Sequence, residues 1–141
     1  MKLVLLAVGK LKDAWAKDGC AEYAKRIAAR LPFSEIEARD DAELIKKIPD
    51  RLQLWVLDSR GQQLTSEELA GKLRTGMNEA LQGIAFVIGG ADGVPAELIK
   101  RAQYKWSLGK GTLPHRLARL VATEQLYRAL TIIRGEPYHH A

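Results

Sequence analysis

Two glycine-containing segments and the C-terminal tail hold the residue types that could do chemistry in this chain. Residues 88–93 read IGGADG and follow an apolar run, and residues 106–115 read WSLGKGTLPH. Glycines let a ligand approach the backbone closely, and ligands of open α/β sheets bind beyond the carboxyl ends of strands. Either segment could therefore hold a small ligand through main-chain hydrogen bonds. The alternatives are a tight turn at residues 88–93 and a flexible connector at residues 106–115.

Common phosphate, hydrolase and metal motifs do not occur in the sequence. The glycine segments match neither GxGxxG nor the P-loop, and there is no GxSxG, CxxC or HExxH. The adjacent His139 and His140 are too few for a complete zinc site, so we predict no metal. Cys20 is the single cysteine, which excludes an intrachain disulfide and suits a small core residue in a reducing compartment.

The elements that must position these segments alternate between strand and helix. Nearly continuous apolar runs at residues 3–8, 52–57 and 84–88 are typical of strands buried on both faces, and weaker strand patterns cover residues 33–38 and 104–108. Helix patterns cover residues 24–31, 42–48, 65–81, 95–103 and 114–133, the third opening with a capping box of Thr65 and Glu68. The alternation predicts an α/β fold, a parallel sheet flanked by helices, in one domain of residues 1–141.

The last predicted helix is apolar on more than one side. Its apolar residues occupy more than one stripe: Leu117, Leu120, Val121, Leu126, Leu130, Ile132 and Ile133. Either neighbours within the fold cover all of this surface, or a second subunit covers part of it. The excess of apolar surface favours a homodimer.

The charge of the chain is concentrated in its last third. The whole chain has 22 Lys and Arg against 17 Asp and Glu, a net charge of +5. Residues 100–141 hold eight of the basic and two of the acidic residues, so their net charge is +6. Either a solvated helix face or a footprint for nucleic-acid phosphates explains the asymmetry. No apolar run approaches the ~20 residues of a membrane span, so we expect a cytoplasmic protein without membrane contact.

Several of these motifs occur in the order of a known family. They are MKL and VGK around the first strand, LD at residues 57–58, IGGADG at 88–93, WSL at 106–108, TLPH at 112–115 and PYH at 137–139. From its first residue to its last, the chain resembles the RlmH family of the SPOUT superfamily, which methylates the RNA of the large ribosomal subunit.

This resemblance implies a fold, a reaction and partners. It implies a SPOUT fold whose C-terminal segment forms a trefoil knot, a topology that general rules of chain connection would have excluded. It also implies a homodimer that uses S-adenosylmethionine to methylate N3 of a pseudouridine in 23S rRNA, on the assembled ribosome.

The resemblance also implies site residues. By motif, the cofactor is expected at Leu57, at Gly89 and along the loop of Leu108, Gly109, Lys110, Gly111, Thr112 and Leu113. The target nitrogen starts with a proton, so a base or a charge-stabilising group would help methyl transfer. We expect His139 in that role, and Tyr138 stacking on or orienting the flipped base. His115, Arg116 and Arg119 are expected to contact RNA, with a structural cap as the alternative for His115.

Two other classes of function stay open at this point. One is a non-catalytic factor that binds or assembles ribosomes with the same basic surface, and it need not bind S-adenosylmethionine. The other is a small flavodoxin-like nucleotide-binding domain, which the missing phosphate loop disfavours.

Overall fold

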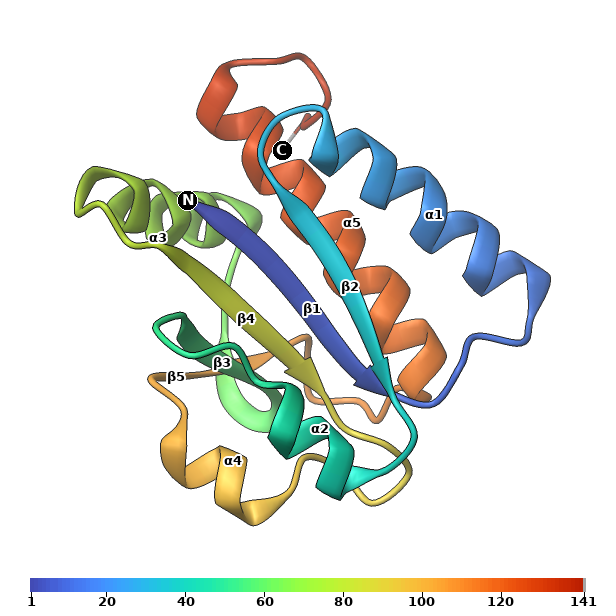
Figure 1. Cartoon of the computed structure of the whole chain (residues 1–141). Helices are drawn as coiled ribbons and strands as arrows, with labels where there is room; N and C mark the ends of the chain where they lie inside the picture. Colours follow the sequence, from blue (N-terminus) through green and yellow to red (C-terminus); the bar gives the residue numbers. More distant parts are fainter. Residues whose placement is uncertain (141) are drawn as a thin grey trace.

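Five parallel strands form one sheet in the computed structural model, which describes residues 1–140 (Figure 1). The strands are β1 (Lys2–Val8), β2 (Phe33–Ala38), β3 (Gln53–Gln63), β4 (Gly83–Ile88) and β5 (Tyr104–Ser107). Their order is β2-β1-β4-β3-β5, and each neighbouring pair is parallel. The predicted class is therefore confirmed. The flavodoxin-like alternative is wrong, because that fold has the order 2-1-3-4-5.

Helices cover both faces of this sheet. On one face lie α1 (Ala14–Ala28), α3 (Ser66–Asn78) and α5 (His115–Arg134), and on the other lie α2 (Asp41–Lys47) and α4 (Ala96–Arg101) (Figure 1). Strand β1 shows why the apolar runs are continuous. Leu3 and Leu5 pack in the first layer and Val4 and Leu6 in the second, and all four are buried.

Two of the helices, α2 and α3, begin where a side chain accepts a hydrogen bond from a backbone N–H of the first turn. The Thr65 hydroxyl accepts from the Glu68 N–H at 3.0 Å, and the Glu68 carboxylate accepts from the Thr65 N–H at 2.8 Å. The predicted capping box at the start of α3 is thus confirmed. At α2, the Asp40 carboxylate accepts from the Glu43 N–H at 2.8 Å, a cap of the same kind.

Strand β3 is longer than its apolar run predicts. The run ends at Leu57, but pairing with β5 resumes at Gln62 and Gln63 after an irregularity that includes Asp58. The hydrogen bonds of this second part are made by the main chain, so the polar side chains there gave no strand signal. The irregularity shifts the register between β3 and β5 after the apolar part of β3.

Helix α5 is wedged between α1 and α3 (Figure 1). Eight of its residues are buried: Arg119, Ala122, Thr123, Leu126, Tyr127, Ala129, Leu130 and Thr131. Neighbours within the fold therefore cover most of its apolar surface, while Leu117, Leu120 and Val121 stay half-buried. The homodimer stays a prediction, and so does the trefoil knot.

No helix within residues 1–140 is long and apolar enough to cross a membrane. The same part of the chain places no three His, Cys, Asp or Glu side chains together as ligands for a metal ion. Cys20 is 1% exposed, which agrees with its expected place in the core.

Candidate functional site

A cavity of about 620 Å³ opens where the apolar part of β3 ends and beyond the carboxyl end of β4, beside the loop between β5 and α5. Its volume falls within the roughly 300–1,000 Å³ of small-molecule sites. Of the eight residues predicted to hold a cofactor, Lys110 is exposed and lies outside the lining. The other seven line the cavity: Leu57, Gly89, Leu108, Gly109, Gly111, Thr112 and Leu113. The fold thus brings together three segments that are distant in the sequence.

The sequence reasoning missed part of this lining. Asp58, Ser59 and Ala118 lie outside the two glycine-containing segments and were not predicted for the site. Six more residues belong to those segments but were not named as cofactor contacts: Ile88, Gly90, Ala91, Gly93, Trp106 and Pro114. The carboxyl ends of parallel strands meet at one edge of a sheet. Residues next to those ends in the sequence could therefore have been predicted to line the site.

Asp58 is the acidic residue of this lining. Its carboxylate lies 3.1 Å from the Nη2 of Arg60, and hydrogen bonds from Arg60 hold the pKa of Asp58 below its usual value. The side chain of Asp58 is largely buried, whereas that of Arg60 is exposed. The cavity wall therefore carries a negative charge at neutral pH.

Two turns shape the floor of the cavity. In the turn after β4, the Gly93 N–H donates to the Gly90 carbonyl at 3.0 Å, and Gly93 has a φ of +83°. The tight-turn alternative for residues 88–93 is therefore confirmed, and the same turn lines the cavity. After β5, the buried Ser107 hydroxyl donates to the Gly109 carbonyl at 2.9 Å and accepts from the Gly109 N–H at 3.1 Å. The start of this loop is thus held by its own hydrogen bonds.

The three residues predicted to contact RNA lie in different surroundings. His115 is exposed at the rim of the cavity. Arg116 is also exposed and lies 2.9 Å from the carboxylate of Asp13. Arg119, by contrast, is buried.

The burial of Arg119 corrects the RNA contact expected of it. Its guanidinium donates to the carboxylates of Glu35 at 3.0 Å and Glu37 at 2.8 Å, two residues of β2. Both Nη groups are therefore paired within the fold, so Arg119 does not fit a contact with RNA phosphate. The α/β pattern could not reveal this, because Glu37 and Glu35 lie 82 and 84 residues before Arg119 in the chain.

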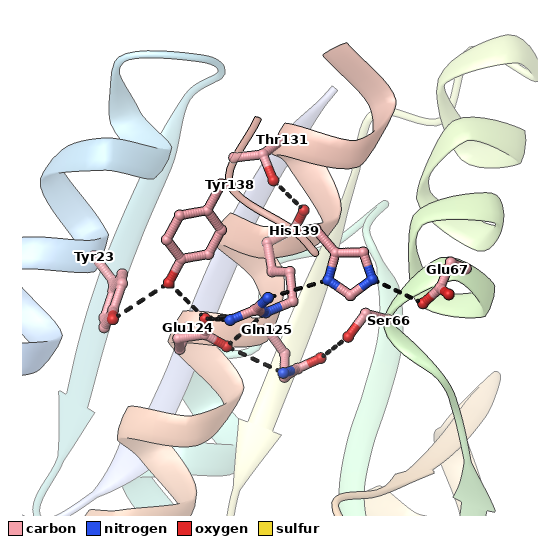
Figure 2. Close-up of polar contacts among 9 residues, drawn as sticks. Tyr23, Ser66, Glu67, Glu124, Gln125, Thr131, Tyr138 and His139 are labelled. Carbon is pink, nitrogen blue, oxygen red and sulfur yellow. Dashed lines mark hydrogen bonds and ion pairs between the residues drawn. The ribbon is translucent and has the colours of Figure 1, made fainter. Parts of the chain in front are cut away.

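Tyr138 and His139 lie against α5 and the start of α3 (Figure 2). The Tyr138 hydroxyl donates to Glu124 at 2.7 Å, and its ring packs edge-on against Tyr127 with centroids 4.6 Å apart. Burial is the largest cause of a raised pKa of Tyr138, and hydrogen bonds with Tyr23 and Glu124 raise this pKa further. The ring is thus occupied within the chain, and it is not open for stacking on a base in this conformation.

These two residues are remote from the cavity of their own chain. Neither belongs to its lining, which reaches α5 at Ala118, whereas His139 contacts Arg128. Ten residues of α-helix separate Ala118 from Arg128, a rise of roughly 15 Å. The structure therefore does not bring the expected catalytic pair to the expected cofactor residues within one chain.

Fold, cavity and sequence together define a class of enzyme. A family model described as "Predicted SPOUT methyltransferase" matches residues 1–139, and the chain belongs to this family. Curated relatives carry the name ribosomal RNA large subunit methyltransferase H. The protein of that name from Cytophaga hutchinsonii is 42% identical over 155 residues, which cover 99% of this chain and 100% of the relative.

Solved structures support the same fold. A protein from Bordetella pertussis described as a probable methyltransferase matches with a TM-score of 0.61 and 12% identity, over 91% of this chain and 95% of that one. A chain from Legionella pneumophila, solved with bound S-adenosylmethionine, matches with a TM-score of 0.50 and 13% identity, over 92% of this chain and 66% of that one.

S-adenosylmethionine is the methyl donor of this family, and the cavity suits it. Leu57, Leu108 and Leu113 offer apolar surface for a purine, and the glycines leave main-chain N–H and C=O groups accessible. The carboxylate of Asp58 offers a negative charge to a cationic cofactor. The size, apolar walls and charge of the site thus fit the group that the family implies.

Proposed function

We propose that this chain transfers a methyl group from S-adenosylmethionine to RNA of the large ribosomal subunit, at N3 of a pseudouridine, on the assembled ribosome. One observation carries the proposal. Three distant segments of a chain that belongs to the SPOUT methyltransferases converge on one glycine-lined cavity. The name of the curated relatives supplies the class of substrate.

The residues that would hold the cofactor follow from the lining. The side chains of Leu57, Leu108 and Leu113 would offer apolar surface to the adenine, and the main chain between residues 108 and 113 would supply hydrogen bonds for its polar edge. The carboxylate of Asp58 would favour the positive charge of the donor. When bound, the cofactor supplies a methyl group that is already activated by its sulfonium. The contribution of the protein is therefore mainly alignment and exclusion of water.

His139 is proposed to act on the substrate base, and Tyr138, whose ring packs against Tyr127, is proposed to help hold His139 in place. Because about 15 Å of helix separates their surroundings from the cavity of the same chain, we infer that a second subunit brings them to it. The half-buried Leu117, Leu120 and Val121 of α5 support an interface between two copies. A homodimer would also place two basic C-terminal thirds on one RNA.

The RNA surface is proposed to include His115 and Arg116 and to extend to the loop before α1. Asp13 of that loop pairs with Arg116, so the loop and the start of α5 form one surface. Lys10 and Lys17 line a second, open cavity over Arg119 and are exposed. They take the place of the buried Arg119 as candidates for contacts with phosphate.

The decisive experiment supplies the protein with ribosomes and labelled S-adenosylmethionine, followed by mapping of the modified nucleotide. We expect label at N3 of one pseudouridine of 23S rRNA. Ribosome binding without methyl transfer, together with no binding of S-adenosylmethionine in calorimetry, would instead identify a non-catalytic ribosome factor.

The role of His139 is tested in the same assay. We expect His139→Ala to lower methyl transfer at least about 100-fold while S-adenosylmethionine still binds, because the residue acts on the substrate and not on the cofactor. The exposed neighbour His140 provides the control, and His140→Ala is expected to keep its activity. Full turnover of His139→Ala would remove His139 from the mechanism.

A further inference from the structure

Outside the cavity, a connected cluster of polar side chains surrounds Tyr138 and His139 near the end of the chain. We call it the tail cluster, and it consists of Glu67 from α3, Glu124 and Arg128 from α5, and Tyr138 and His139 (Figure 2). Its members come from segments up to 72 residues apart. Glu67, Glu124 and Arg128 have no part in the proposed cofactor site.

Both ring nitrogens of His139 have a partner of defined hydrogen-bonding character. Nδ1 lies 3.0 Å from the Nη1 of Arg128, and Nε2 lies 3.2 Å from the Oε1 of Glu67. A guanidinium only donates, so Nδ1 must accept and cannot carry a proton in this arrangement. A carboxylate only accepts, so the proton of the ring belongs on Nε2. The two contacts therefore select the same tautomer.

Arg128 is itself held so that it cannot easily turn away from His139. Its Nη2 and Nε donate to Oε2 of Glu124 at 2.7 and 3.1 Å. Glu124 also accepts from the Tyr138 hydroxyl at 2.7 Å, and the guanidinium lies 4.7 Å from the centre of the Tyr138 ring. Tyr138 thus helps to fix Glu124 and Arg128, and Arg128 is the donor to His139.

The two sides of His139 differ in how accessible their partners are. The side chain of Arg128 is 25% exposed and is fixed by Glu124, whereas that of Glu67 is 59% exposed. An incoming group can therefore displace Glu67 far more readily than Arg128. A group that replaces Glu67 would face the N–H of Nε2 of His139.

We propose that Arg128 and Glu67 are positioning residues that hold His139 as its Nε2–H tautomer, so that His139 meets the substrate as a hydrogen-bond donor. The substrate group it suits is an oxygen acceptor, such as a carbonyl of the target base, on which negative charge grows as the proton of the ring nitrogen passes to solvent water. This inference rests on the proposed function for the identity of the substrate. Of the two roles open to His139, it selects charge stabilisation over proton abstraction.

The tautomer is measured by nitrogen NMR of the imidazole in the full-length protein, without RNA or methyl donor. We expect His139 to show a protonated Nε2 and an unprotonated Nδ1. Arg128→Met is expected to lose this preference, Arg128→Lys to retain it because a donor remains, and Glu67→Ala to weaken it. Arg134→Met is the matched control, since Arg134 lies on the same helix and pairs with Glu136 instead.

A protonated Nδ1 in the unchanged protein, or an unchanged tautomer in Arg128→Met, would overturn the inference. If Arg128→Met does not fold, the tautomer of His139 is compared between Glu67→Ala and the unchanged protein. Glu67 is exposed, so its replacement should not prevent folding. An unaltered tautomer there would overturn the role assigned to Glu67, because Arg128 alone would then select the tautomer.

Activity gives a second readout of the donor role. A glutamine side chain has an N–H donor but cannot serve as a general base. We expect His139→Gln to transfer methyl groups at least about tenfold faster than His139→Ala, and equal rates would overturn the donor role. A protein that shows the tautomer yet transfers no methyl group would contradict the proposed function while supporting the positioning by Arg128 and Glu67.

Discussion

Gly89 passes so close to Gly93 that a β-carbon on Gly89 would overlap the Gly93 carbonyl group. The contact is between two stretches of backbone, so no flexible side chain can move aside. The resemblance implies that Gly89 is a cofactor residue. The turn after β4, which lines the cavity, also requires a glycine at this position because there is no room for a β-carbon.

We expect Gly89→Ala to destabilise the protein by about 2 kcal/mol or more and to weaken binding of S-adenosylmethionine, because the overlap must displace the turn. Thermal denaturation and calorimetry measure the two effects. Gly71→Ala is the control. A β-carbon there meets nothing within 4 Å, and alanine in the exposed interior of α3 should stabilise by up to about 1 kcal/mol. Equal stability of the two variants would show that the turn after β4 can relax.

Gly111 presents the opposite case, because it lines the cavity and a β-carbon on it meets no protein atom within 4 Å. We expect Gly111→Val to fold normally and to bind S-adenosylmethionine at least about tenfold more weakly, since the added side chain occupies the space of the ligand. The neighbouring Lys110 lies outside the lining, so Lys110→Val should keep its affinity. Unchanged affinity of Gly111→Val in calorimetry would argue against this loop as the cofactor site.

Arg119 is expected to act on stability and not on RNA binding. Arg119→Leu leaves the carboxylates of Glu35 and Glu37 without their partner, which should cost about 3 kcal/mol, the lower end for a buried pair because both glutamates are partly exposed. Arg116→Leu, one turn earlier on α5, breaks an exposed pair with Asp13 and should cost less than about 1 kcal/mol. Denaturant titration measures both changes. A small loss of stability in Arg119→Leu, combined with weaker ribosome binding, would restore Arg119 as an RNA contact.

Cys20 is expected to make the stability of the protein depend on alkaline pH. The pKa of its thiol is raised from 9.0 to about 11, mainly by burial and in addition by the negative charge of the nearby Glu35. The folded state therefore holds the thiol proton more tightly than the unfolded state. The stabilisation is complete below about pH 9 and is lost as the pH rises to about 11.

Comparison with Cys20→Ala isolates this effect from the lysines and tyrosines that titrate over the same range. The difference in unfolding free energy between the two proteins should shrink between pH 9 and 11. A constant difference would show that the thiol has an ordinary pKa. The native thiol should also react with a water-soluble disulfide reagent only on unfolding, because Cys20 is 1% exposed.

Local patterns in the sequence predict the class of fold and most of its elements. They miss the second part of β3 and the first ten residues of α1, which spans Ala14–Ala28 and not the predicted residues 24–31. Strands such as β1 and β4 are buried on both faces, and this burial requires the unbroken apolar runs that the sequence shows. The capping box of Thr65 and Glu68 is equally local, since its hydrogen bonds span three residues. The motifs also indicated the family, and through it seven of the seventeen residues that line the cavity.

Only the tertiary structure decided which residues share a site. Arg119 and Arg116 look alike in the sequence, but β2 supplies two carboxylates to one and leaves the other at the surface. His139 has its partners on α5 and at the start of α3, and not at the cavity whose motifs precede it in the chain. Local periodicity depends on neighbours within a few residues, whereas charge pairing, burial and hydrogen-bond partners depend on which distant segments the fold places in contact.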